Sequence, residues 1–122
     1  MMMTNMQIYD IANALGEHFQ DKELKMPIKI NFYLQKNKNT LMALAQEIEQ
    51  ARVEIIRKYG NLDESSNQFI VPPESIAAAT AELKEFFGLE QDVTIYKVNI
   101  EAFNNLELTT GQMEALLFMI EE

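Results

Sequence analysis

The chain has 122 residues, 48% of them hydrophobic, and a formal net charge of −9, so it can form one domain, residues 1–122, with a buried core. It has no cysteine and one histidine, which leaves almost no residues for disulfides, thiolate chemistry, zinc ligation or a nucleophilic triad. We find no secretory signal and no apolar run long enough to span a bilayer, so we expect a soluble, intracellular protein that contacts no membrane.

The charge is unevenly distributed along the sequence. Residues 1–21 carry a net charge of −3, residues 22–58 carry +4 and residues 59–122 carry −10. An acidic chain binds nucleic acid poorly, so we expect no nucleic-acid partner. The acidic half could face a basic partner, although we favour the simpler explanation that the charge serves solubility.

The first predicted element is a helix over residues 4–20, with Thr4 or Asn5 as its cap and apolar residues at helical spacing. Residues 20–26 are charged and predict a connector that ends at Pro27. The helix before this connector and the one after it would form a helical hairpin.

Residues 27–59 predict one long amphipathic helix. Apolar residues recur there in steps of three and four, with one gap that Asn37 fills: Ile30, Leu34, Leu41, Leu44, Ile48, Ala51, Ile55 and Tyr59. Pro27 suits the first helical position, Arg57 and Lys58 suit the last turn, and Gly60 suits a left-handed stop. At about 1.5 Å per residue the helix would run roughly 50 Å, so other segments, a second copy or a partner must cover its apolar face.

An alternative for the start of this helix is a strand. Ile28, Ile30, Phe32 and Leu34 also alternate with a period of two, and poor helix formers follow before Thr40. A strand over residues 28–34, a turn and a helix from Thr40 would satisfy that pattern. We favour the single helix, because the heptad phase continues through Asn37, and a polar residue at such a position can fix register and partner number.

The second half predicts shorter elements. A polar loop over residues 61–67 precedes a brief strand at 68–71, and Pro73 opens a helix over 74–87 with Ile76, Ala79, Leu83 and Phe86 inward. Residues 93–100 alternate as a strand with a bulge near Tyr96, and this strand could pair in parallel with 68–71 or with another molecule. A capping box, Thr109 with Gln112, opens a last helix over 110–121, with an apolar face that we expect to be buried: Met113, Leu116, Leu117 and Ile120.

The predicted fold is therefore mainly α, of the α+β type. It is a helical hairpin with one long central helix at about 28–59, two further helices and a minimal two-stranded sheet.

One basic patch is the candidate interaction site. It lies in the first half of the long helix and includes Asn37, the polar residue in the apolar stripe. Its members are Lys29, Tyr33, Lys36, Asn37 and Lys38. The patch could meet phosphate or an acidic protein surface, but it carries no nucleic-acid-binding motif, and an ordinary solvated helix face would look the same.

No part of the sequence predicts catalysis. His18 lies near a helix end with Glu17 and Asp21 close in sequence, but Glu17 does not share its helix face. The acid pairs Glu47 with Glu54 and Glu82 with Glu85 lack the close, apolar setting of a general acid. We therefore expect no catalytic, cofactor-binding or metal-binding residues.

Several stretches resemble one known group of proteins. They are residues 27–37 (PIKINFYLQKN), 49–52 (EQAR) with 58–60 (KYG), 71–74 (VPPE) and 108–116 (LTTGQMEAL). Together they are similar to small proteins encoded by bacteriophages and prophages of Gram-positive bacteria. The resemblance implies a phage-borne accessory protein in the bacterial cytoplasm, or on the virion, and it carries over no functional residues.

These observations predict a non-enzymatic phage or prophage protein that acts by protein–protein interaction, as a virion or assembly component or as an adaptor. It would bind a protein partner or associate with itself, as a homo-oligomer. The alternative is an acidic inhibitor of a host defence or transcription protein, which would place residues 59–122 against a basic groove. An enzyme that uses a divalent metal is a third hypothesis.

Overall fold

The computed structural model describes residues 1–19 and 25–121. This part of the chain contains four α-helices, three short 3-10 helices and six strands of two or three residues each. The structure confirms the mainly α fold with one long central helix. Most of the predicted connector, residues 20–24, lies outside the described residues.

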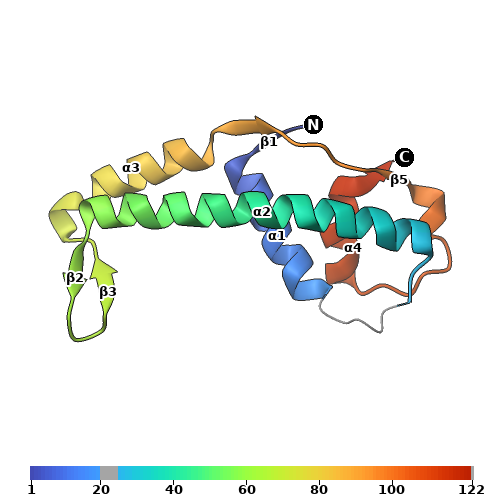
Figure 1. Ribbon diagram of the computed structural model, residues 1–122, viewed down its shortest axis with the longest axis horizontal. Helices are drawn as coiled ribbons and strands as arrows, with labels where there is room; N and C mark the ends of the chain where they lie inside the picture. Colours follow the sequence, from blue (N-terminus) through green and yellow to red (C-terminus); the bar gives the residue numbers. More distant parts are fainter. Residues whose placement is uncertain (20–24, 122) are drawn as a thin grey trace.

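The long helix α2 spans Ile28–Tyr59 (Figure 1). Residues 28–34 are helical, so the strand alternative is wrong, and the heptad phase does continue through the polar position. The buried residues of α2 follow the predicted seam: Ile30, Leu34, Asn37, Leu41 and Ile48.

Both ends of α2 differ slightly from the prediction. Pro27 precedes the first helical residue, and its carbonyl accepts a hydrogen bond from the amide of Asn31 at 3.0 Å. Gly60 does not adopt the left-handed conformation, because its φ of −101° and ψ of 161° are extended. A Cβ at Gly60 would lie 2.8 Å from the carbonyl oxygen of Ile56. The glycine is therefore needed for a close approach and not for a left-handed turn.

Helix α1 spans Asn5–His18 and packs on α2, as the hairpin prediction requires. Thr4 and Gln7 form a capping box at its start, so Thr4 is the cap. Figure 1 shows α1 crossing α2 near its middle instead of running along it. Because of that angle, α1 covers only a limited length of the long helix.

The prediction of a strand over residues 93–100 is largely wrong. Among the described residues, 93–97 pair with no strand, and of this stretch only β5, Val98–Asn99, is part of a ladder, parallel to β6, Ile120–Glu121. The strand β4, Glu90–Asp92, pairs antiparallel with β1, Met2–Thr4. Val93 and Val98 are buried, so the alternation comes from an extended segment that packs on the core without strand partners.

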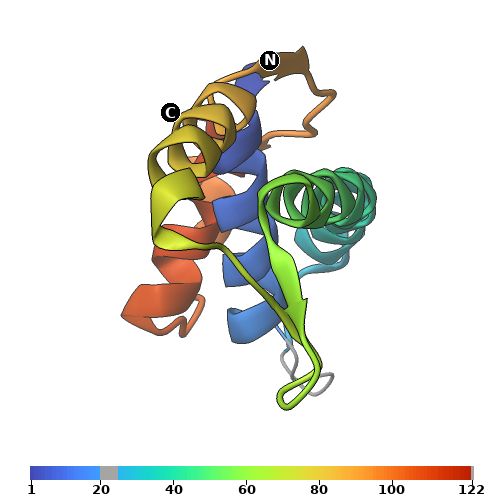
Figure 2. The same ribbon diagram turned by 90° about the vertical axis from the view of Figure 1, so that its left-hand side faces the viewer.

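The predicted parallel pairing with residues 68–71 is also wrong. The strand β3, Gln68–Ile70, pairs antiparallel with β2, Asn61–Asp63, in a hairpin that the polar composition of residues 61–67 did not predict. Asp63 stabilises the turn, because its carboxylate accepts hydrogen bonds from the hydroxyl groups of Ser65 and Ser66 at 2.8 Å each. This hairpin extends away from the helices (Figures 1 and 2).

Helix α3, Ile76–Phe87, follows the 3-10 helix η1, Pro73–Ser75, with proline at its start as predicted. It lies along the carboxyl half of α2 (Figure 1). Ala79 is its buried residue. Ile76, predicted to point inward, is exposed, because it is the first residue of α3, at the end of that helix far from the core.

The last helix is shorter than predicted. The capping box of Thr109 and Gln112 opens α4, Thr110–Leu116, as predicted, but a 3-10 helix η3, Leu117–Met119, and then β6 follow it. The buried face lies one residue before the predicted one, already within α4, where Ala115 and Leu116 are buried. Leu116 and Met119 are buried, whereas Met113 and Leu117 are exposed, so the burial predicted for those two is wrong.

The core lies along α2 from Ile30 to Ile48, where buried residues of this helix pack with those of α1, α4 and residues 93–103. The buried residues of α2 end at Ile48. The rest of α2, with α3 and the hairpin, extends beyond the core (Figure 1). No helix in the described ranges has the length and apolar character needed to cross a membrane.

Candidate functional site

The amino end of α2 presents lysines and aromatic rings on one exposed face. Lys29, Phe32, Tyr33 and Lys36 are three or four residues apart and are therefore neighbours on the helix surface. The buried seam lies on the side away from Phe32, and Tyr33, half-buried and packed against the core, lies at the boundary between the two. Together with Ile28 and Tyr96, these four residues form what we call the amino-end surface.

The rings and the ammonium groups of this surface contact one another. Tyr33 stacks on Tyr96, with ring centroids 5.5 Å apart and an interplanar angle of 27°. The Nζ atom of Lys36 lies 5.1 Å from the ring centroid of Phe32 and 5.2 Å from that of Tyr96, and the Nζ of Lys29 lies 5.9 Å from that of Tyr33. Such cation–π contacts contribute about 0.5–1 kcal/mol each at exposed sites, so they hold the lysines over the rings without neutralising them.

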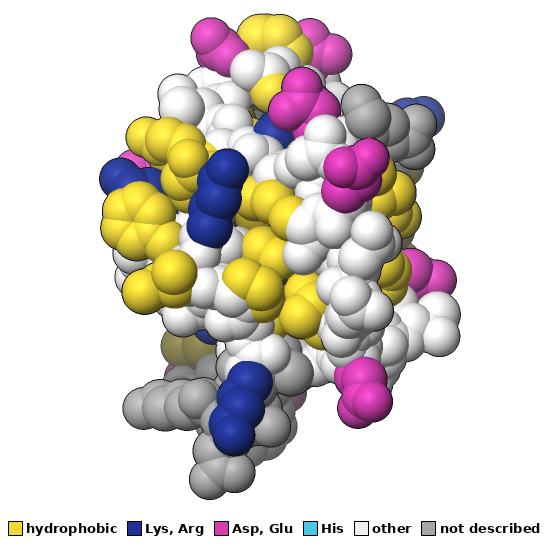
Figure 3. Space-filling view, turned by 90° about the vertical axis from the view of Figure 1, so that its right-hand side faces the viewer, with side chains coloured by type: hydrophobic (Ala, Val, Ile, Leu, Met, Phe, Trp, Pro, Cys, Tyr) yellow, Lys and Arg dark blue, Asp and Glu magenta, His cyan; other side chains and the backbone are white. Residues whose placement is uncertain are grey.

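The amino-end surface exposes large apolar groups. Ile28 is 86% exposed and Phe32 is 56% exposed, and Tyr96 and nearby Ile100 are exposed as well. Figure 3 looks at this end of the molecule and shows hydrophobic side chains gathered around a lysine. Single exposed apolar residues are ordinary, but a contiguous group rimmed by charge is typical of an interaction site.

The lysines of this surface are uncompensated. Residues 25–38 contain four lysines and no acid, a net charge of +4. Within the described residues, no carboxylate lies within ion-pair distance of Lys29 or Lys36. At the other end of α2 the basic residues all have partners: Arg52 pairs with Glu49, Arg57 with Glu54 and Lys58 with Glu82.

Asn37 positions Tyr96 from inside the core. Its side-chain Nδ2 donates a hydrogen bond to the Tyr96 carbonyl oxygen at 2.8 Å, and its Oδ1 accepts one from the Tyr96 amide at 2.8 Å. The asparagine is fully buried, and both polar ends of its amide are satisfied. The backbone that carries Tyr96 is therefore fixed against α2, which preorganises the aromatic part of the surface.

Three of the five predicted site residues lie together, and the other two lie elsewhere. Lys29, Tyr33 and Lys36 meet on the amino-end surface. Asn37 is buried, and the Nζ of Lys38 lies on another flank, 3.5 Å from the Phe19 carbonyl oxygen.

Sequence reasoning missed Phe32 and Tyr96 as members of the surface. The spacing of Phe32 and Lys36, four residues apart on a helix, was a usable signal. Tyr96 is far away in sequence and gave no comparable signal.

His18 lines a pocket of about 320 Å³ between α1 and α4, together with Asp10 and Glu114 and mostly apolar neighbours. Its ring packs against Gly111, where a Cβ would collide with the ring atoms. Among the described residues, the His18 side chain makes no hydrogen bond to either acid. The ring therefore fills space between two helices, without the carboxylate partner that orients a general base.

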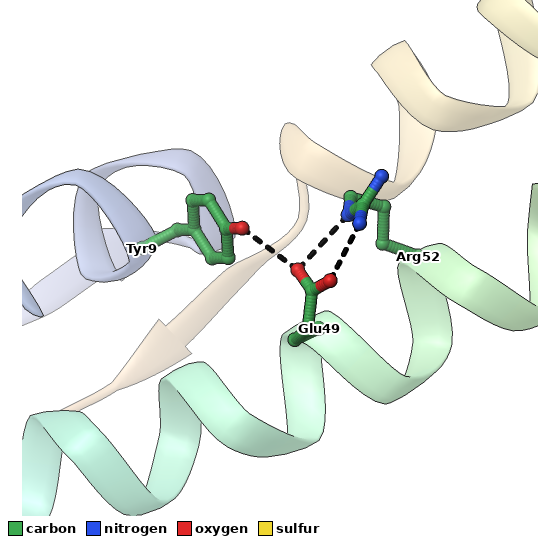
Figure 4. A network of polar contacts seen from close by, with 3 residues as sticks. All are labelled: Tyr9, Glu49 and Arg52. Carbon is green, nitrogen blue, oxygen red and sulfur yellow. Dashed lines mark hydrogen bonds and ion pairs between the residues drawn. The ribbon is translucent and has the colours of Figure 1, made fainter. Parts of the chain in front are cut away.

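One carboxylate has a strongly shifted pKa, for a structural reason. Hydrogen bonds from Arg52 and then from the Tyr9 hydroxyl lower the pKa of Glu49 to about 2 (Figure 4). The Arg52 Nε and the Tyr9 hydroxyl donate to the same carboxylate oxygen, at 2.9 Å and 2.7 Å. This network joins α1 to α2 and keeps Glu49 ionised, which is the opposite of what a general acid requires.

In the described ranges, residues 1–19 and 25–121, no three histidine, aspartate or glutamate side chains are close enough together to hold a metal ion.

Comparison with protein-family models, with curated proteins and with solved structures finds no match to this chain.

Proposed function

We propose that this chain is a phage or prophage accessory protein that acts by binding protein through its amino-end surface. One observation carries the proposal: an uncompensated ammonium group, that of Lys36, lies between two exposed aromatic rings, those of Phe32 and Tyr96. Aromatic side chains such as Phe32 and Tyr96 are enriched at protein interfaces, and tyrosine is among the residues that contribute most to binding energy there. Because Asn37 already fixes the Tyr96 backbone, little of that surface has to be ordered on binding.

The bacteriophage origin rests on a different observation. The stretches at residues 27–37, 71–74 and 108–116 resemble small phage and prophage proteins. Two of them correspond to distinctive structural positions, the start of α2 and the capping box of α4. A virion or assembly component, or an adaptor, in the bacterial cytoplasm or on the virion is the role that fits this origin.

The test is a capture experiment with the immobilised chain and a lysate of phage-infected Gram-positive cells. We expect the wild type to retain a partner that Phe32→Ala and Lys36→Glu each bind at least about tenfold more weakly. Two matched variants control for the chemistry of the changes. Leu117→Ala removes an exposed apolar group elsewhere, and Lys84→Glu reverses an exposed charge on α3. Equal capture by all five proteins would contradict the proposal.

A second candidate function has its own observation. Within residues 59–121, Glu82 and Asp92 are the only carboxylates that form ion pairs among the described residues, so this half presents many free carboxylates. An acidic inhibitor of a host defence or transcription protein would use them against a basic groove. In the same experiment such a partner would be retained by Lys36→Glu and released at high salt, because salt screens exposed charges.

A further inference from the structure

The other end of α2 complements the amino-end surface in charge. Residues 54–82 contain two basic and five acidic residues, a net charge of −3. Both basic residues are paired within this segment, Arg57 with Glu54 and Lys58 with Glu82. Asp63 accepts hydrogen bonds inside its own turn, which leaves Glu64 and Glu74 as exposed carboxylates without an ion-pair partner among the described residues.

Exposed aliphatic side chains accompany these two carboxylates. Leu62 and Ile70 on the hairpin and Ile76 at the start of α3 are each more than half exposed. They lie at the end of the molecule where α2 stops, and the hairpin there extends away from the start of α3 (Figure 2). We call these five residues the hairpin end. It combines acids with aliphatic groups, as the amino-end surface combines bases with aromatic ones.

These two surfaces cannot meet within one molecule. They lie at opposite ends of α2 (Figure 1), a helix of 32 residues that spans about 48 Å at 1.5 Å per residue. Acidic side chains also lie on this end of the molecule (Figure 3), but among the described residues none is within ion-pair distance of Lys29 or Lys36. The opposite charges and exposed apolar groups of the two surfaces can therefore meet between two copies but not within one.

We infer that the partner of the amino-end surface is a second copy of this chain, which docks its hairpin end there in a head-to-tail contact. This inference rests on the proposed function and names its partner. Glu64 and Glu74 would approach Lys29 and Lys36, while the aliphatic side chains of the hairpin end would cover Phe32 and Ile28. A contact between two different surfaces repeats from copy to copy, so it produces open chains or rings and not a closed symmetric dimer.

Sedimentation of the whole chain tests the inference directly. We expect the average mass of the wild type to rise between micromolar and millimolar concentrations, and its apparent dissociation constant to increase at least about tenfold from low to high salt. A wild type that stays monomeric throughout this range would overturn the inference. So would a dimer that salt does not weaken.

Charge reversal gives a sharper test. One variant carries Lys29→Glu with Lys36→Glu, and the other carries Glu64→Lys with Glu74→Lys, all at exposed positions. Each variant alone brings like charges together and should remain monomeric, whereas an equimolar mixture restores opposite charges and should associate again. Lys84→Glu, a charge reversal on α3 away from both surfaces, should associate like the wild type. A mixture that stays monomeric, while the wild type associates, would contradict a contact between these two surfaces.

Failure here is distinguishable from failure of the proposed function. A monomeric wild type that still captures a partner through Phe32 and Lys36 would refute self-association and leave the binding role standing. If neither surface variant changes capture or mass, both proposals fail together.

Discussion

At the scale of single residues, the sequence identified Asn37 as a polar residue with a structural role but predicted the wrong contact partner for it. Its place in the heptad seam predicted a polar residue that sets register between helices. In the structure it sets the register of an extended segment of its own chain, through two hydrogen bonds to the Tyr96 backbone. The physical reason is the same in both cases, since a buried amide must find partners.

Replacing Asn37 by alanine should therefore destabilise the fold. The substitution leaves the Tyr96 amide and carbonyl without their partners and opens a small cavity, at a cost of about 1–3 kcal/mol in the free energy of unfolding. Urea unfolding followed by circular dichroism measures this cost. Asn39→Ala is the matched control, because Asn39 is an exposed residue of the same helix. Equal unfolding free energies for the two variants would show that the hydrogen bonds from Asn37 to the Tyr96 backbone contribute nothing to stability.

The amino-end surface marks the limit of prediction for single residues. Lys29, Tyr33 and Lys36 were recognised because they lie close together on one helix, where spacing determines which side chains meet. Tyr96 joins them through a tertiary contact with Asn37, 59 residues away. Periodicity carries no information on such pairs, so the stacked half of the surface could not be predicted.

At the scale of elements, the polar network of Tyr9, Glu49 and Arg52 connects α1 to the middle of α2. Glu49 has a pKa of about 2 in the folded protein, below its ordinary value of 4.5. The ionised form is therefore favoured by folding, and its contribution to stability is complete above the unfolded pKa. It is lost as the pH falls from about 4.5 toward 2.

Unfolding of Glu49→Gln should reveal this dependence. We expect the variant to be less stable than the wild type at neutral pH, and the difference to shrink as the pH drops through that window. The Glu49 side chain is 40% exposed, so solvent screening limits the difference to at most about 1 kcal/mol. Glu47→Gln, at an exposed acid of the same helix, controls for the lost charge. A difference that stays constant between neutral pH and pH of about 2 would contradict the account.

Elements with strong periodicity were predictable, and short pairings were not. The 32-residue α2 repeats its apolar seam many times, and the predicted capping box of Thr109 and Gln112 marks the first residue of α4. Each strand has only two or three residues, too few for an alternation to be distinguished from chance. Residues 93–97 show the opposite error, since their alternation reflects packing against the core without any strand partner.

At the scale of the whole molecule, α2 determines where everything else lies. The core lies along α2 as far as Ile48, while α3 lies along the rest of α2 and the hairpin extends from its carboxyl end (Figure 1). The sequence predicted a helix longer than a compact domain of this size, and the buried positions of α2 do end at Ile48. Which residues gather at each end depends on the tertiary fold, so the opposite charges of the two ends became visible only in the structure.

The central claim is that one continuous helix holds two complementary surfaces apart, and a distance across it is the most direct test. The chain has no cysteine, so spin labels can be attached at Asn31→Cys and Glu54→Cys without any background. Electron–electron double resonance at low protein concentration should give a single narrow distance near 35 Å, from about 1.5 Å per residue over the separation of the two sites. A broad distribution, or a main distance well below this value, would mean that the helix is broken and that its two ends are not held apart.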